Sequence, residues 1–325
     1  MADFLTDLIP VLDTTIRTSA PLILAALAGL ISERAGIFDI SLEGKMLMAA
    51  FAAGAAAASF GSPWAGMLVG VLVSVLLALV HGYVTIHQRG NQIVSAMALN
   101  IMAAGLAPSL AIYLYHRGGQ TPFLQDGERF GEIHLPLADS IASLPLLGPL
   151  YADIVSGHSL LTYLAYLAPL VVIYILYHSL FGVRLRAAGE NPEALDTAGI
   201  SVFRIRYSAV IIGGVLCGLA GVFLSLGSGA PNFIPNMTAG RGYLALAAMI
   251  FGRWKPVPTL LACLLFGFFD ALQSRLQGAD LPLVGVIPIQ FTQILPYVVT
   301  VVVLGVFAGK IIPPAAAGQP YSKER

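Results

Sequence analysis

The sequence predicts an all-α polytopic membrane protein of about nine transmembrane helices, with about eight to ten as the range, in inverted-repeat halves with interrupted helices. Of the 325 residues, 57% are hydrophobic and only 10% are charged. The mean hydropathy is +0.83, which leaves too little polar surface for a water-soluble globule. The apolar residues also form long runs between short polar loops. We therefore expect residues 1–325 to form a single transmembrane domain.

The polar loop at residues 182–206 sets the expected orientation of the chain. Lys and Arg in short loops are retained on the cytoplasmic side of a membrane, and this loop contains Arg184, Arg186, Arg204 and Arg206. The loop separates a first half, 1–181, from a second half, 207–309. The tail, 310–325, is basic and is also expected inside. Counting spans from the loop places the N-terminus outside.

A short helix is predicted inside this loop, at residues 192–198. Asn191 is a good N-cap, Pro192 suits the first helical position, and Glu193 complements the positive end of the helix dipole. Gly199 can end the helix in a left-handed conformation. Because so short a helix is marginal in water, we expect it to pack on a partner protein.

The first half is expected to contain five spans. Residues 1–17 form either a short interfacial helix or a frayed terminus before the first span. The second span consists mostly of small side chains and is expected to lie inside the bundle, since small residues let backbones approach closely. The acidic stretch at 116–158 fits the outside. The five spans are 18–32, 46–60, 64–86, 91–115 and 159–181.

The second half is expected to contain four spans, with outside segments at 227–239 and 277–288. Residues 241–251 are too few to cross a membrane alone. Gly240-Arg241 opens a small-residue helix much as Gly44-Lys45 does in the first half. This parallel indicates inverted repeats, although chance similarity between Gly/Ala-rich helices would produce it too. The four spans are 205–226, 241–251, 257–276 and 291–308.

Two motifs resemble a known family. The pattern R-x-R-A-x-G-E-N-P-x-A-x-x-x-A-G-I, at 184–200, is similar to the cytoplasmic coupling loop of bacterial ABC importer permeases. The run at 33–47 resembles the signature of the nucleoside-type branch of the branched-chain amino acid, simple sugar and nucleoside permeases. Asp39 and Ser41 stand where that family more often has Asn and Gly, which leaves the solute less certain than the class.

The resemblance implies a permease subunit of an ATP-binding-cassette importer in a bacterial inner membrane, carrying a nucleoside-like solute. It implies ATPase subunits on separate chains, a second permease and an extracytoplasmic solute-binding protein as partners. A monosaccharide or branched-chain amino acid remains open as the solute, and an ion-coupled secondary transporter remains open as the class. The expected ATPase contacts are Glu190, Asn191, Pro192, Glu193, Ala194 and Leu195.

Polar residues in apolar surroundings are candidates for a solute pathway, because a charge in the bilayer is costly. Asp39 and Glu43 precede the second span, where Lys45 could reach either carboxylate. They either line the pathway or brace the fold as an ion-pair cluster. Asn91, Ser95 and Asn100 either bind a polar solute or join helices by hydrogen bonds. Asp270 and Arg275 are expected to form a structural pair.

No catalytic function is expected. The sequence lacks H-E-x-x-H, G-x-S-x-G and P-loop motifs, so ATP hydrolysis is expected on another chain. We expect no cofactor or metal, and membrane lipid but not nucleic acid as a partner, since no basic patch is present. Cys217 and Cys263 lie in apolar runs and are expected to be structural. The six histidines are expected to be solvated or interfacial.

Overall fold

The computed structural model describes residues 2–135, 150–277, 280–281, 285–286 and 312–322, with positions 294, 298, 301, 302 and 305. The expected ninth span at 291–308 and most of the loop at 277–288 therefore lie outside the described residues. The regular secondary structure of the described part is almost entirely helical.

The helices are α1 (Ala2–Arg34), α2 (Leu42–Phe60), α3 (Pro63–Gly82), α4 (Gln92–Tyr115), α7 (Leu160–His178), α8 (Leu180–Glu190), α9 (Pro192–Thr197), α10 (Val202–Val222), α11 (Arg241–Phe251) and α12 (Pro256–Leu276). The π-helical turns are η1 (Tyr83–His87), η2 (Leu150–Val155) and η3 (Phe223–Gly227). Two antiparallel strand pairs are β1 (Glu132–Ile133) with β2 (His158–Ser159), and β3 (Asp280–Leu281) with β4 (Gly285–Val286).

Six helices in the described part are long and apolar enough to cross a membrane. The count of about nine is not confirmed, because α2 and α11 are not among the six and the ninth segment is not described. The six candidate spans are Leu8–Arg34, Pro63–His87, Gln92–Tyr115, Leu160–His178, Val202–Gly227 and Pro256–Leu276.

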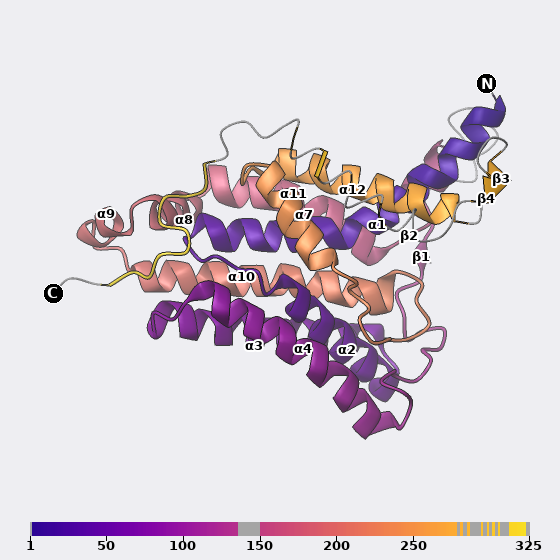
Figure 1. The fold of residues 1–325 in the computed structure, drawn as a ribbon, viewed down its shortest axis with the longest axis horizontal. Helices are drawn as coiled ribbons and strands as arrows, with labels where there is room; N and C mark the ends of the chain where they lie inside the picture. The colour runs from indigo at the N-terminus through magenta and orange to yellow at the C-terminus, as the bar shows by residue number, and fades with distance from the viewer. Residues whose placement is uncertain are drawn as a thin grey trace.

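The helices α1 and α10 form the centre of the bundle. Figure 1 shows them side by side along the longest axis, with α2, α3 and α4 on one side and α7, α11 and α12 on the other. In their most apolar windows, 78% of α1 and 72% of α10 is buried, against 39% or less in α3, α4, α7 and α12. These four outer helices present apolar side chains to the surroundings, as helices facing lipid do.

The N-terminal segment differs from the expectation. A separate interfacial helix followed by a short span beginning at residue 18 is wrong, because α1 is one continuous helix of 33 residues. Arg17, the last residue of the expected N-terminal segment, is paired with acidic residues within the fold. It lies 3.2 Å from Asp13 and 3.1 Å from Glu132.

The prediction that the second span is buried in the bundle is confirmed. Most of α2 is buried, and its small side chains allow neighbouring backbones to approach closely. A Cβ added at Gly221 of α10 would lie 2.3 Å from the carbonyl oxygen of Met46. One added at Gly70 of α3 would lie 2.9 Å from that of Ala49. These glycines are therefore required by packing.

A non-helical segment, residues 35–41, joins α1 to α2. Figure 1 shows it running back along α10 from the end of α1, so that α2 begins well inside the bundle. Non-helical backbone at membrane depth is tolerated only where protein or a water-filled cavity surrounds it. Ala35, Ile37 and Asp39 in this segment are accordingly buried.

Candidate functional site

The expected short helix in the loop at 182–206 is present as α9. The side chain of Asn191 accepts a hydrogen bond from the backbone nitrogen of Ala194 at 3.0 Å, as an N-cap does. Gly199 has φ +77°, and the backbone nitrogen of Ile200 donates to the carbonyl of Leu195 at 3.2 Å. Both local predictions are confirmed, and the helix ends within one residue of its expected position.

One face of α9 packs on other parts of the same chain. The expectation that a partner protein must provide the packing surface is therefore wrong for that face. Leu195 is buried and belongs to the hydrophobic core. Glu193 and Ala194 are exposed, as is Asn191. The helix therefore has a buried anchor and an outer face that is free for a partner.

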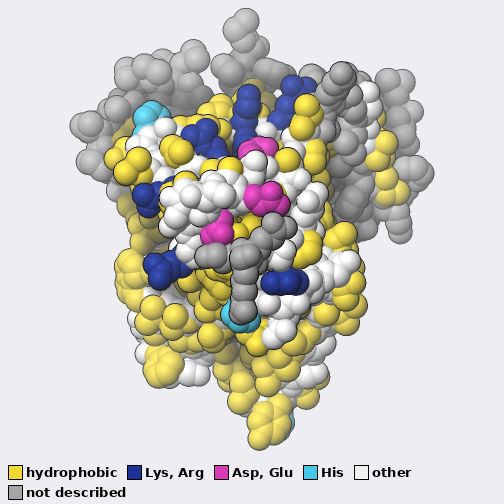
Figure 2. Space-filling view, turned by 90° about the vertical axis from the view of Figure 1, so that its left-hand side faces the viewer, with side chains coloured by type: hydrophobic (Ala, Val, Ile, Leu, Met, Phe, Trp, Pro, Cys, Tyr) yellow, Lys and Arg dark blue, Asp and Glu magenta, His cyan; other side chains and the backbone are white. Residues whose placement is uncertain are grey.

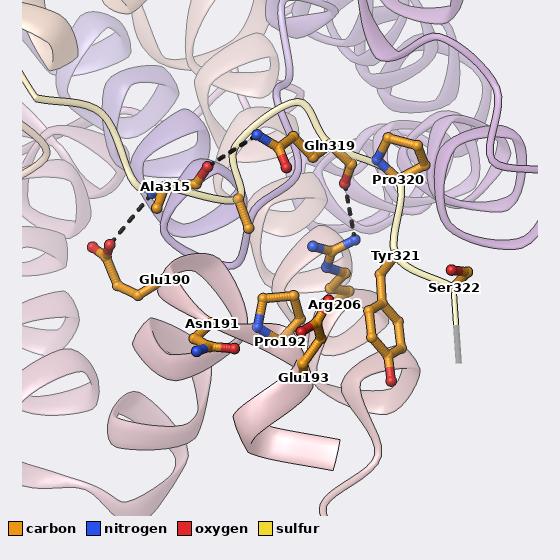
Figure 3. A pocket seen from close by; sticks show the side chains of 11 residues that line it. Glu190, Asn191, Pro192, Glu193, Arg206, Ala315, Gln319, Pro320, Tyr321 and Ser322 are labelled. Carbon is orange, nitrogen blue, oxygen red and sulfur yellow. Dashed lines mark hydrogen bonds between the residues drawn. The ribbon is translucent and has the colours of Figure 1, made fainter. Parts of the chain in front are cut away.

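The tail residues 312–322 lie against α8 and α10 beside α9. Ala316 donates its backbone N–H to the carbonyl of Gly189 at 2.8 Å, and Ala315 donates to the Glu190 carboxylate at 3.3 Å. Figure 3 shows the cavity that results, with Glu190, Glu193 and Arg206 on one side and the tail on the other. Its volume is about 320 Å³. The tail is therefore part of the same structural unit as α9.

The same end of the molecule contains the ends of α1 and α11. Trp254 donates its indole N–H to Glu33 at 2.6 Å, and Arg34 donates to the carbonyl of Trp254 at 2.9 Å. Arg34 Nη1 also lies 4.0 Å from Glu190. Figure 2 shows Lys and Arg side chains gathered at this end, with a few acidic ones among them. Such clustering agrees with a cytoplasmic end.

A second group of polar residues lies inside the bundle, where α2 begins. Lys45 forms an ion pair with Asp39, and both side chains are fully buried. Asp39 also accepts hydrogen bonds from the backbone and the hydroxyl of Ser41. The non-helical segment before α2 thus brings Lys45 to Asp39, one of the two carboxylates that we expected it to reach.

The other carboxylate, Glu43, contacts a helix from the second half. It accepts hydrogen bonds from the backbone nitrogens of Gly240 at 2.8 Å and Gly242 at 2.7 Å. These groups begin α11, where free N–H groups and the helix dipole favour a negative charge. The starts of α2 and α11 therefore meet inside the bundle. From that point α11 runs to the end where Trp254 contacts Glu33.

Asn100 completes this central polar cluster. Its side-chain oxygen accepts from the backbone nitrogen of Gly44 at 2.8 Å. Its amide nitrogen donates to the carbonyl of Ile40 and to the hydroxyl of Tyr243, both at 3.1 Å. Asn100 is buried, whereas Tyr243 is 43% exposed. Tyr243 is thus the most exposed residue of these polar partners.

Asn91 lies apart from this cluster, whereas Ser95 adjoins it through His81. Asn91 is exposed and caps α4, accepting from the backbone nitrogens of Ile93 and Val94. Ser95 bonds with His81 at 3.1 Å, and the other ring nitrogen of His81 lies 3.3 Å from the carbonyl of Phe38. The structure therefore brings Asp39, Glu43 and Asn100 together at the start of α2 and leaves Asn91 at a helix end.

Three sequence interpretations need correction or addition. His81 and His158 are buried, so the expectation that all six histidines are solvated or interfacial is wrong for these two. Asp270 lies 3.7 Å from Arg241 and does not form the expected pair with Arg275. Tyr243 was not identified from the sequence. Its neighbours in the chain do not show whether its side chain only packs against apolar residues or also forms a hydrogen bond to a polar cluster.

Metal binding finds no support in the part of the chain that the structure describes. There, no group of three or more His, Cys, Asp and Glu side chains is arranged to hold a metal ion. Cys217 and Cys263 are free thiols and are buried.

The comparisons with known proteins agree with this architecture. The profile of the family described as "Branched-chain amino acid transport system / permease component" matches residues 11–304. The chain belongs to this permease family. Relatives include a nucleoside ABC transporter permease of Lactococcus lactis, 38% identical over 94% of this chain and 95% of the relative. A guanosine ABC transporter permease of Bacillus subtilis is 35% identical over 96% of both chains.

One relative of this permease is named for a different solute. A protein of Haloferax volcanii, provisionally named a glucose ABC transporter permease, is 34% identical over 96% of this chain and 97% of the relative. Among solved structures, a metal-chelate type ABC transporter in an inward-facing conformation matches with a TM-score of 0.51 and 14% identity. The match covers 92% of this permease and 84% of that chain. At that identity the match shows the fold, which is that of an ABC transporter permease.

Proposed function

We propose that this permease forms the translocation pathway of an ATP-driven importer for nucleosides in the plasma membrane. The observation that carries the proposal is the capped helix α9, whose outer face is exposed. This helix lies at the end of the molecule where Lys and Arg side chains gather, in a chain of the permease family. Two relatives named for nucleoside or guanosine transport, similar over nearly their whole length, support the choice of solute.

The proposed partners follow from this function. ATPase subunits on separate chains dock on the end of α8 and the start of α9 through Glu190, Asn191, Pro192, Glu193 and Ala194. Leu195, the sixth residue expected from the sequence to contact them, is buried within the permease. A second permease completes the pathway, and an extracytoplasmic binding protein delivers the solute. In this arrangement Leu195 anchors the helix, while Glu193 and Ala194 face the ATPase.

The proposed topology has about nine crossings, with the N-terminus outside and the tail inside. It adds α2, α11 and the segment at 291–308 to the six candidate spans. The two halves are inverted repeats, an arrangement supported by the meeting of the starts of α2 and α11 at Glu43. Interrupted helices of this kind line solute sites near the membrane midplane in other transporters. The proposed pathway residues are Asp39, Glu43, Asn91, Ser95 and Asn100.

The test begins with affinity purification of the permease from its native cells, with mass spectrometry of the proteins and small molecules that accompany it. The purified complex is then reconstituted with its binding protein in vesicles that contain ATP. We expect ATPase subunits to accompany the permease and labelled guanosine to enter only when ATP is present. Uptake that follows an ion gradient without ATP would overturn the proposal in favour of a secondary transporter.

A monosaccharide is the second candidate solute, favoured by the relative from Haloferax volcanii. The same vesicles distinguish the two solutes by competition. Excess unlabelled glucose leaves guanosine uptake unchanged if the solute is a nucleoside. ATP-driven uptake of labelled glucose, but not of guanosine, would replace the nucleoside by a sugar and leave the importer class intact.

A further inference from the structure

Arg206, near the start of α10, is a buried cation with few partners. Only 1% of it is exposed. Its Nη1 donates to the carbonyl oxygen of Gln319 at 3.4 Å, and its Nε and Nη2 have no hydrogen-bond partner among the described residues. A guanidinium has five N–H donors, and a buried charge without a counter-ion is strongly unfavourable. Among the residues that the structure describes, the guanidinium therefore has no paired anion.

Within tail residues 312–322, the groups that contact Arg206 are neutral. The guanidinium carbon lies 6.0 Å from the ring centroid of Tyr321, which also packs edge-on against Phe203 at 5.8 Å. Burial raises the pKa of Tyr321, and the carboxylates of Asp196 and Glu193 raise it further. Tyr321 thus stays a neutral phenol and cannot serve as the counter-ion.

Two carboxylates line the cavity that Arg206 borders. Glu190 is already engaged, since it accepts from the backbone nitrogen of Ala315 at 3.3 Å and lies 4.0 Å from Arg34. Glu193 is exposed, and in the described part of the chain it forms no hydrogen bond or ion pair. Figure 3 shows Glu193 and Arg206 bordering the same cavity. Of the two carboxylates that line the cavity, Glu193 is thus the one without a hydrogen bond or ion pair among the described residues.

We propose that Glu193 is the counter-ion of Arg206 in a second conformation of the permease, in which α9 moves into the cavity toward the tail. The proposal rests on the proposed function, in which an ATPase displaces α9. The short helix is anchored mainly through Leu195, and the cavity of about 320 Å³ gives its first turn room to move. Because Arg206 belongs to the central helix α10, the new ion pair transmits the position of α9 to the core of the bundle.

The first test measures the movement without altering either charge. Pro192→Cys and Gln319→Cys place thiols on opposite sides of the cavity and leave the Asn191 cap in place, and the native cysteines are buried. A short bifunctional thiol reagent is applied to the complete transporter, nucleotide-free and vanadate-trapped. We expect crosslinking to be about tenfold faster in the trapped state, because the fraction of molecules in which α9 lies close to the tail is expected to rise about tenfold. Adding Glu193→Gln is expected to remove the acceleration, and each single-cysteine variant controls for background.

The second test is a double-mutant cycle that exchanges the charges of Glu193 and Arg206 and measures uptake by the reconstituted transporter. Glu193→Arg and Arg206→Glu are each expected to lower ATP-driven uptake about tenfold, the loss expected for one charge-assisted interaction. The double exchange is expected to restore most of it. Arg204→Gln is the matched control, since Arg204 is exposed two residues away, and it is expected to leave uptake unchanged.

The outcomes separate this proposal from the function on which it rests. If the unaltered complex shows no ATP-driven uptake, the proposed function fails and this pairing fails with it. If the unaltered complex transports, equal crosslinking in both nucleotide states overturns the pairing alone. Acceleration that survives Glu193→Gln does the same. The crosslinking arm remains decisive if Arg206→Glu fails to fold.

Discussion

Glu43 Oε2 lies 2.7 Å from the backbone nitrogen of Gly242 and accepts its hydrogen bond. A carboxylate in the first turn of α2 thereby caps the N-terminus of α11, 199 residues later in the chain. This contact joins the two halves of the permease inside the bundle. Removal of this contact should therefore lower both the stability of the permease and its rate of transport.

Replacing Glu43 by Ala is expected to destabilise the permease by about 1–3 kcal/mol for each buried N–H that it leaves without a partner. Gly240 and Gly242 would both lose their acceptor. Glu43→Gln keeps one acceptor oxygen and should lose less. Thermal unfolding of the purified variants in detergent measures the order. Equal stability of both variants with the unaltered permease would contradict the capping role.

The buried pair of Lys45 and Asp39 predicts a non-additive result. Lys45→Met or Asp39→Asn alone should cost about 3–5 kcal/mol, because each leaves an uncompensated buried charge. The double variant should recover much of this loss, since both charges are then absent. Denaturant unfolding of the three variants measures the coupling. Additive losses would show that the two charges act independently.

The N-cap of α9 predicts a difference between two substitutions at one position. Asn191→Ala removes the acceptor for the backbone nitrogen of Ala194 and should cost about 0.5–2 kcal/mol of local helix stability. Asn191→Asp retains an acceptor and is the matched control. Hydrogen exchange at residues 192–197 in the purified transporter measures the effect. Exchange that is equally fast in both variants would rule out capping as the reason for this helix.

Two glycines predict opposite responses to the same added methyl group. A Cβ at Gly189 would lie 2.2 Å from the backbone oxygen of Arg34, so Gly189→Ala should displace α8 from α1 and cost about 1–3 kcal/mol. A Cβ at Gly105 meets nothing within 4 Å. Gly105→Ala should be neutral or stabilising by up to about 1 kcal/mol, since Ala favours helix. Thermal unfolding compares the pair, and similar losses in both would contradict the close contact.

The sequence predicted features that local chemistry determines. The cap at Asn191, the turn at Gly199 and the burial of α2 all depend on residues adjacent in the chain, and the structure confirms each of them. The family follows in the same way, because the motifs at 33–47 and 184–200 are contiguous and the matched profile covers them.

The sequence could not show which distant residues satisfy a polar group. The segment that ends at Arg17 was expected to be separate from the first span, yet the charge of Arg17 is paired with Glu132, 115 residues away. His81 was expected to be solvated or interfacial, but it is buried, and its ring nitrogens lie within hydrogen-bond distance of Ser95 and of the carbonyl oxygen of Phe38. The expected pair of Asp270 with Arg275 was wrong for the same reason, since Asp270 lies beside Arg241 in the fold. The ATPase contacts and the pathway residues stay predictions.

The central position of α1 constrains how the permease is made. This helix is synthesised before three of the helices that it packs against, α10, α11 and α12, which begin at residues 202, 241 and 256. Chains fold as they emerge from the ribosome, N-terminal parts first. Until those partners arrive, the hydroxyls and charges along α1 face lipid or the insertion machinery. Assembly of the bundle therefore cannot be completed before most of the chain has entered the membrane.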